Sequence, residues 1–160
     1  MDTTAALLRT AVFLAGTCIL VEGGGIGAQV ICPAGYKYYQ GSCYSFKTEV
    51  VNFETAREIC QADGGDLTSI MTRSENIYVG NMADGQRSWI GGIRTKSDAV
   101  TTSFRWVSRE PWGFTSWRKR EPNNWGGREH CIETNFVRRA WWNDHFCTKE
   151  KPFVCEISIL

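Results

Sequence analysis

The amino-acid sequence lacks the patterns that define several large classes of protein. It contains no apolar stretch of about 20 residues, the length that a membrane-spanning helix needs. It also contains no internal repeat, no collagen-like triplet, no heptad run and no Asn-x-Ser/Thr acceptor site for N-linked glycans. The formal net charge is only +1, which gives no general reason to expect a nucleic-acid partner. A chain of 160 residues without these features is predicted to be one folded domain with at most a short appendage.

The longest apolar run lies near the N-terminus, from Ala11 to Val21, and follows Arg9. Its length of about eleven residues suits the hydrophobic stretch of a secretory signal peptide, and small residues follow it as far as Ala28. We therefore expect residues 1–28 to be an export signal and residues 29–160 to be the domain of a secreted, extracellular protein with no membrane insertion. A retained N-terminal anchor is the alternative.

The cysteine count agrees with export. Seven cysteines occur in the chain, and Cys18 lies inside the expected signal. An even number remains, which in a secreted chain favours a disulfide framework over free thiols. Six cysteines allow fifteen connectivities, and spacing alone does not choose between them. The six are Cys32, Cys43, Cys60, Cys131, Cys147 and Cys155.

Local patterns predict two helices early in the chain and strands later, which indicates an α+β domain. Asn52 is a plausible N-cap for a helix that carries Phe53, Ala56, Arg57 and Cys60 on one face and stops at Gly64-Gly65. Thr72 begins a capping box for a second helix that extends to about Met82. A hairpin is expected within residues 32–46, and strands are expected at residues 89–92, 104–107, 131–134 and 153–157. Residues 107–131 are irregular, and a stretch of this length is usually functional or disordered.

Two short segments, residues 121–131 and 141–147, hold the polar residues of interest. A disulfide between Cys131 and Cys147 would place their Cα atoms roughly 5.5 Å apart and bring the two segments together. A turn at Gly126-Gly127 would fold the first segment back on itself. Three carboxylates and two amides would then meet: Glu121, Asn123, Glu129, Asn143 and Asp144.

This set of side chains favours a calcium ion. Carboxylates about 5 Å apart repel one another by roughly 3 kcal/mol per pair at an effective dielectric near 20, and a cation removes that cost. Oxygen donors from Asp, Glu and Asn suit Ca²⁺, which accepts six to eight oxygen ligands. Five side chains would leave coordination positions open for two neighbouring hydroxyls of a sugar. Glutamate can accept a hydrogen bond from such a hydroxyl, and an asparagine amide can donate one.

These motifs resemble the C-type lectin family. Glu121-Pro122-Asn123 and Trp142-Asn143-Asp144 are similar to that family's calcium and sugar motifs, and Trp89-Ile90-Gly91-Gly92 is similar to its core strand motif. The resemblance covers residues 32–155. It implies two helices, two small antiparallel sheets and a long loop region. It also implies three disulfides, in the pairs Cys32–Cys43, Cys60–Cys155 and Cys131–Cys147.

The resemblance further implies a site. It makes all five polar residues calcium ligands, with a cis peptide before Pro122, and it places Glu121, Asn123, Glu129, Asn143 and Trp125 at the sugar. Members with Glu-Pro-Asn prefer mannose, N-acetylglucosamine or fucose, so mannose-type glycans on microbes, in innate immune recognition, are the implied partners. Avidity for them would call for a homo-oligomer. Two departures leave points open. Asn124 and His130 stand where mannose-binding members often carry Asp ligands of an accessory calcium, and Trp125 stands where galactose binders carry a tryptophan.

Other interpretations of the same residues remain. His130, Cys131, His145 and Cys147 match a Cys₂His₂ zinc set, although a full disulfide complement argues against it. Glu121 and Glu129 could pose as the acid and base of a glycosidase, but a shared metal site explains them better, and we expect no enzyme. The remaining alternatives are a galactose-preferring lectin and an extracellular matrix or biomineralisation protein of the same fold.

Overall fold

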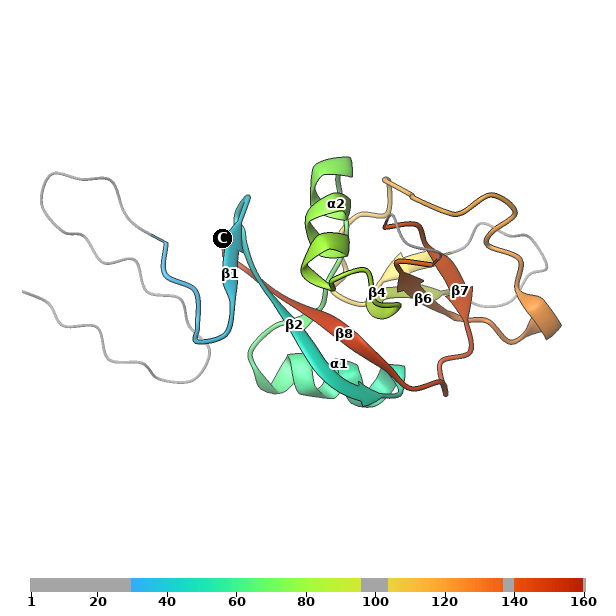
Figure 1. The fold of residues 1–160 in the computed structure, drawn as a ribbon, viewed down its shortest axis with the longest axis horizontal. Coiled ribbons are helices and arrows are strands. Elements are labelled where there is room, and N and C mark those ends of the chain that lie inside the picture. The colour runs from blue at the N-terminus through green and yellow to red at the C-terminus, as the bar shows by residue number, and fades with distance from the viewer. Residues whose placement is uncertain (1–29, 96–103, 137–139, 160) are drawn as a thin grey trace, which may run out of the picture.

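The computed structural model describes residues 30–95, 104–136 and 140–159 (Figure 1). The expected export signal, residues 1–28, lies outside the described residues. Within the described ranges, no helix is long and apolar enough to cross a membrane.

Both helices begin where their caps predict. Helix α1 (Phe53–Ala62) follows Asn52, whose side chain accepts a hydrogen bond from the Thr55 N–H at 3.0 Å. Helix α2 (Arg73–Met82) follows Thr72, whose hydroxyl accepts from the Glu75 N–H at 3.2 Å. Of the two hydrogen bonds that define the predicted capping box, only this one, from the Glu75 N–H to Thr72, forms. The Glu75 carboxylate instead accepts from the Met71 N–H and the Tyr44 hydroxyl, both at 2.6 Å.

The strands form one mixed sheet in the order β1-β2-β8-β4-β6-β7, with β3 paired to β8 and β5 paired to β4. Antiparallel pairing forms two groups of strands, as the family resemblance implies. One group is β1, β2, β3 and β8, and the other is β4, β5, β6 and β7. A single parallel pair, Trp89 with Phe153, joins β4 to β8 and makes the two groups continuous. The strands are β1 (Lys37–Tyr39), β2 (Ser42–Val51), β3 (Asp66–Leu67), β4 (Ser88–Arg94), β5 (Phe104–Trp106), β6 (Cys131–Thr134), β7 (Asn143–His145) and β8 (Lys151–Ser158).

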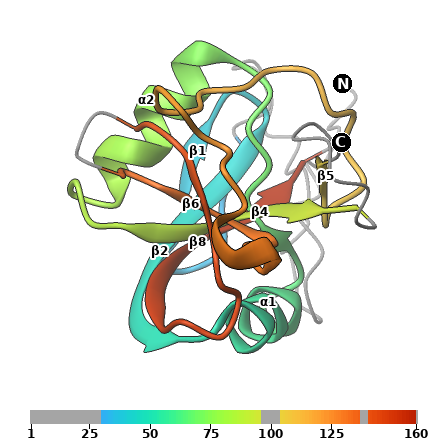
Figure 2. The same ribbon diagram turned by 90° about the vertical axis from the view of Figure 1, so that its right-hand side faces the viewer.

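Each face of the central strands packs against its own apolar cluster. In Figures 1 and 2, α1 and α2 lie on opposite sides of the β2–β8 pair. Because side chains alternate along a strand, Phe153 joins the cluster that contains α1, and Val154 joins the cluster that contains α2. Trp89 and Ile90 divide in the same way on β4, and both are fully buried. Strand β4, which ends beside the site described below, is therefore packed on both faces.

Three disulfides link the described residues, in the same pairs that the family resemblance implies: Cys32–Cys43, Cys60–Cys155 and Cys131–Cys147. The last has a Cα–Cα distance of 5.2 Å and ties β6 to the segment just after β7. Because Cys131 and Cys147 are bonded to each other, they have no thiolate to offer, and the zinc interpretation is wrong.

The irregular segment before β6 lies at the end of the molecule away from β1 and the C-terminus (Figure 1). A single 3-10 turn, Trp125–Gly127, interrupts it among the described residues of 107–130. Backbone hydrogen bonds attach the segment to Trp142, which donates to the Ser116 carbonyl at 2.8 Å and accepts from the Arg118 N–H at 3.0 Å. The loop is thus held against the residue that immediately precedes β7.

Candidate functional site

Asp144, on β7, joins the long loop to the sheet. Its side chain is fully buried, and each carboxylate oxygen accepts a backbone hydrogen bond from the loop. The Asn123 N–H reaches Oδ1 at 3.0 Å, and the Asn124 N–H reaches Oδ2 at 2.9 Å. The peptide bond between Glu121 and Pro122, immediately before these donors, is cis. The loop therefore reaches β7 at the point where the sequence places its Glu-Pro-Asn motif.

The 3-10 turn brings Glu129 back to the start of the loop. Gly126 and Gly127 both have positive φ, 65° and 70°, a conformation that glycine adopts without a steric cost. After the turn, the Glu129 N–H donates to the Asn124 side-chain oxygen at 3.0 Å, and the Glu129 carboxylate accepts from the Trp125 N–H at 2.8 Å. Glu129 is only 5% exposed. The turn expected from the two glycines is thus the one that folds the loop.

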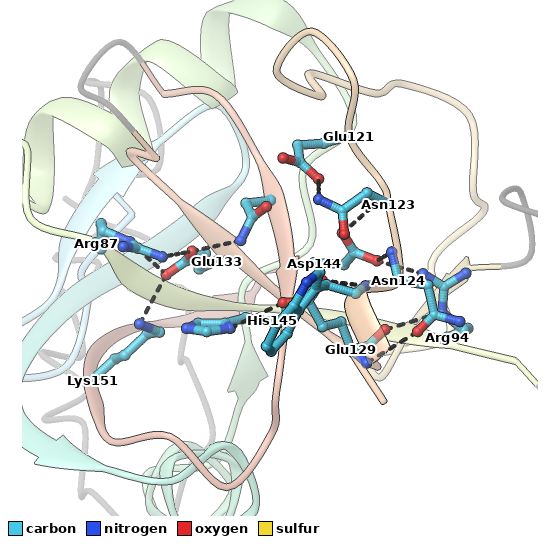
Figure 3. A network of polar contacts seen from close by, with 12 residues as sticks. Arg87, Arg94, Glu121, Asn123, Asn124, Glu129, Glu133, Asp144, His145 and Lys151 are labelled. Atoms are coloured by element: carbon cyan, nitrogen blue, oxygen red, sulfur yellow. Dashed lines mark hydrogen bonds and ion pairs between the residues drawn. The ribbon is translucent and has the colours of Figure 1, made fainter. Parts of the chain in front are cut away.

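The five residues predicted as ligands lie in one region, which Figure 3 shows for four of them. Asn123 Nδ2 donates to Glu121 Oε2 at 2.6 Å, beside the Asp144 carboxylate. Asn143 precedes Asp144 on β7 and points its amide nitrogen at Glu133 Oε1, 2.9 Å away on the adjoining strand β6. Glu133 therefore fixes the orientation of the Asn143 amide and leaves the amide oxygen of Asn143 as a potential metal ligand.

The carboxylates influence one another electrostatically. Burial raises the pKa of Glu121, and the charges of Asp144 and Glu129 raise it further. Burial also raises the pKa of Glu129; the Trp125 N–H opposes that change, and the Asp144 charge adds to it. Both shifts mean that burial first, and the neighbouring carboxylates second, disfavour the ionised forms of Glu121 and Glu129. A bound divalent cation would relieve that repulsion.

The donor chemistry fits Ca²⁺. All five side chains offer oxygen, the donor that hard cations prefer, and three of them are carboxylates. Among the residues that the structure describes, no group of three or more His, Cys, Asp or Glu side chains is placed to hold a metal by itself. A calcium ion would therefore depend on the amide oxygens of the two asparagines as well. Such a site needs both the loop and β7.

Sequence reasoning missed two charged residues that support this region. Arg94, the last residue of β4, forms an ion pair with Asp144, and Glu133 on β6 orients Asn143. No motif marks either of them. Arg94 lies 50 positions before Asp144 in the sequence, so only the pairing of strands brings the two together.

Trp125 is the exposed aromatic residue of the loop. Its side chain is 69% exposed and meets the Phe146 ring edge-to-face at a centroid distance of 5.9 Å. Trp89 and Trp106, by contrast, are fully buried and belong to the core. The Trp125 indole therefore presents an exposed apolar surface on the residue whose backbone N–H donates to the Glu129 carboxylate.

Comparisons with known proteins identify the family to which this fold belongs. Residues 49–157 match the family model described as the lectin C-type domain. The galactose-specific lectin nattectin of Thalassophryne nattereri is 31% identical over 156 residues, which cover 90% of this chain and 92% of nattectin. The carbohydrate-recognition domain of cow CD23 superposes with a TM-score of 0.72 at 29% identity, over 81% of this chain and 98% of that one. A Ca²⁺-dependent type II antifreeze protein, in its Ca²⁺-free form, superposes with a TM-score of 0.71 at 28% identity, over 79% and 100%. The chain belongs to the C-type lectin family, with the α+β fold of that family.

Proposed function

We propose that this protein binds carbohydrate through a calcium ion held by the long loop and β7. The observation that carries the proposal is the direct attachment of Asn123 and Asn124 to the two oxygens of Asp144, which gathers the loop's donors beside those of β7. Three carboxylates and two amides of one small region then offer oxygen atoms to one calcium ion. The five ligands are Glu121, Asn123, Glu129, Asn143 and Asp144.

The chain's own side chains would orient the sugar. Calcium, when bound, supplies open coordination positions for two neighbouring hydroxyls. Glutamate oxygens at positions 121 and 129 accept hydrogen bonds from those hydroxyls, and the amide nitrogens of Asn123 and Asn143 donate. The two amide nitrogens now donate to Glu121 and Glu133, so each has a built-in acceptor that fixes its direction. This division of donors and acceptors is what would make binding selective.

We assign mannose-type sugars as the ligand class, because Glu121 and Asn123 form the Glu-Pro-Asn motif. Galactose is the second candidate, and Trp125 is the observation that favours it. Its 69% exposed indole could pack on the apolar face of a galactose ring, and nattectin is a galactose-specific relative. The two sugars would use the same metal and differ in which hydroxyl pair they present.

A direct test combines calcium titration with sugar competition. The disulfide-bonded protein is titrated with CaCl₂ by calorimetry, and its retention on mannose-agarose is measured in calcium and in EGTA. We expect binding in calcium, release by EGTA, and competition by free mannose rather than free galactose. Competition by galactose alone would assign the second candidate. Absence of calcium binding at millimolar supply, or retention unaffected by EGTA, would overturn the proposal.

A paired substitution tests the readers of the sugar. Glu121→Gln with Asn123→Asp exchanges the donor and acceptor order of the motif, so we expect preference to move from mannose toward galactose. Glu49→Gln is the matched control, because Glu49 is an exposed residue of β2 outside the loop. Unchanged selectivity in the double variant would remove Glu121 and Asn123 from the sugar contact.

The proposal extends to the setting in which the protein acts. Residues 1–28 would be removed on export, and residues 29–160 would act outside the cell as a binding protein rather than a hydrolase. One site per domain binds a monosaccharide weakly, so several copies would act together on a microbial surface. N-terminal sequencing of the protein from culture medium, with light scattering for its mass, tests both statements. Turnover of a glycan substrate would contradict the assignment as a binding protein.

A further inference from the structure

Arg94 is a buried cation in direct contact with the candidate site. Its side chain is 5% exposed, and its Nη2 lies 2.5 Å from Oδ2 of the fully buried Asp144. Its Nε donates to the backbone carbonyl of Glu129 at 3.1 Å. The guanidinium also lies over the Phe104 ring, 4.4 Å from the centroid. Figure 3 shows Arg94 beside Asp144, Asn124 and Glu129.

These contacts connect three separate parts of the chain. Arg94 ends β4, and its backbone N–H donates to the His130 carbonyl at 2.8 Å. Through two of its side-chain nitrogens, Nε and Nη2, it reaches Glu129 near the end of the loop and Asp144 in the middle of β7. A planar guanidinium can make both bonds at once because its donors are fixed in a fork. A lysine ammonium is a single point and lacks that geometry.

Arg94 leaves Asp144 able to bind a metal. A carboxylate has about four lone-pair positions. Asp144 Oδ2 accepts from Arg94 and from the Asn124 N–H, whereas Oδ1 accepts from the Asn123 N–H. One position on Oδ1 therefore remains for a cation while Oδ2 stays bonded to Arg94. The arginine and a calcium ion can use the same carboxylate from different sides.

We propose that Arg94 is a positioning residue that holds the loop and Asp144 in the ligand-ready arrangement before any metal binds. The functional value of this ordering rests on the proposed function, because calcium would then meet ligands that are already in place. The ordering itself is a property of the metal-free protein. A bridging role needs the fork of the guanidinium, whereas simple charge neutralisation needs only a positive charge. Arg94→Lys keeps the charge and removes the fork, so it distinguishes the two roles.

The test measures the loop without metal. Hydrogen exchange of peptides covering residues 121–131 is followed by mass spectrometry in EGTA for the wild type, Arg94→Met, Arg94→Lys and Arg57→Met. Arg57 is the matched control, because its guanidinium on α1 is part-buried, pairs with Asp66 at 3.0 Å and also contacts a backbone carbonyl, that of Val107. Calcium affinity of each protein is then measured by calorimetry.

We expect both Arg94 variants to lose protection in residues 121–131, and calcium affinity to fall by about 10–100-fold, the usual effect of losing a partner that orients a metal ligand. Arg57→Met should keep wild-type protection. Wild-type protection in either Arg94 variant, or tighter calcium binding by Arg94→Met, would overturn the bridging role. Should Arg94→Met fail to fold, Arg94→Lys still decides the question. Protection in EGTA does not require calcium binding, so a wild type that binds no calcium refutes the proposed function separately.

Discussion

Replacement of Glu133 by glutamine tests how a buried ion-pair network supports the strands behind the site. Glu133 is fully buried on β6 and accepts from three side chains. Lys151 Nζ and Asn143 Nδ2 each lie 2.9 Å from one of its oxygens, and Arg87 contacts both oxygens. Glutamine keeps the shape of the side chain but has a single acceptor oxygen and no charge, so it cannot satisfy all three donors.

The size of the effect follows from the burial of the partners. Lys151 is 11% exposed, so losing its charge-assisted bond costs about 2 kcal/mol. Arg87 is 43% exposed and can turn to water, so its loss costs at most about 1 kcal/mol. We therefore expect Glu133→Gln to lower the free energy of unfolding by about 3 kcal/mol. For a domain of this size, that loss lowers Tm by about 10 °C.

The same network sets the sign of a pH effect. Burial raises the pKa of Glu133, but Arg87 and Lys151 together lower it more, so the pKa lies below its ordinary value. A carboxyl with a lowered pKa contributes stability above its unfolded pKa, and that stability is lost as the pH falls through the folded pKa. Glu133→Gln should therefore destabilise the protein most at neutral pH and least in acid.

The assay is urea unfolding followed by tryptophan fluorescence at neutral and acidic pH, with the disulfides intact. Asp63→Asn is the control, because Asp63 also pairs with a lysine, Lys47 at 2.7 Å, but both side chains are considerably more exposed. We expect that control to lose less than about 1 kcal/mol. A loss in Glu133→Gln no larger than in the control, or equal losses at both pH values, would refute the reasoning.

Three other substitutions test separate parts of the molecule. Asp144→Asn removes one of the three carboxylates at the same volume, so calcium titration should detect no binding while far-UV circular dichroism is unchanged; retained binding would exclude Asp144 as a ligand. Burial, together with the Glu75 charge, raises the pKa of Glu156, so its contribution to stability is fully present below the unfolded pKa and is lost as the pH rises through the folded pKa. Glu156→Gln should remove that decline in urea midpoints, and an unchanged pH profile would contradict this. A Cβ on Gly65 would lie 2.1 Å from the Glu156 carbonyl oxygen, so Gly65→Ala should lower the free energy of unfolding by about 1–3 kcal/mol. Gly113→Ala is the control, because a Cβ there would have nothing within 4 Å and should change Tm little. Equal melting temperatures of the two variants would contradict the packing argument.

Local chemistry made much of the scaffold predictable. Asn52 and Thr72 bond to N–H groups three residues ahead, so the information that starts each helix is contiguous in the sequence. The Gly126-Gly127 turn is equally local, because it depends on the positive φ that glycine permits. Short strands were harder. β3 and β7 have two and three residues, too few for alternation to show, and they exist because longer strands offer them partners.

By itself, the sequence determined which chemistry this protein can carry: oxygen donors in two short segments, cysteines flanking them, and the caps and turns that start and end its elements. Tertiary structure alone decided which distant charges support those donors. Arg94 reaches Asp144, and Glu133 reaches Asn143, only because β4, β6 and β7 are adjacent in the sheet. The physical reason is that hydrogen bonds and charge pairs act over a few ångströms in space, whatever the separation along the chain.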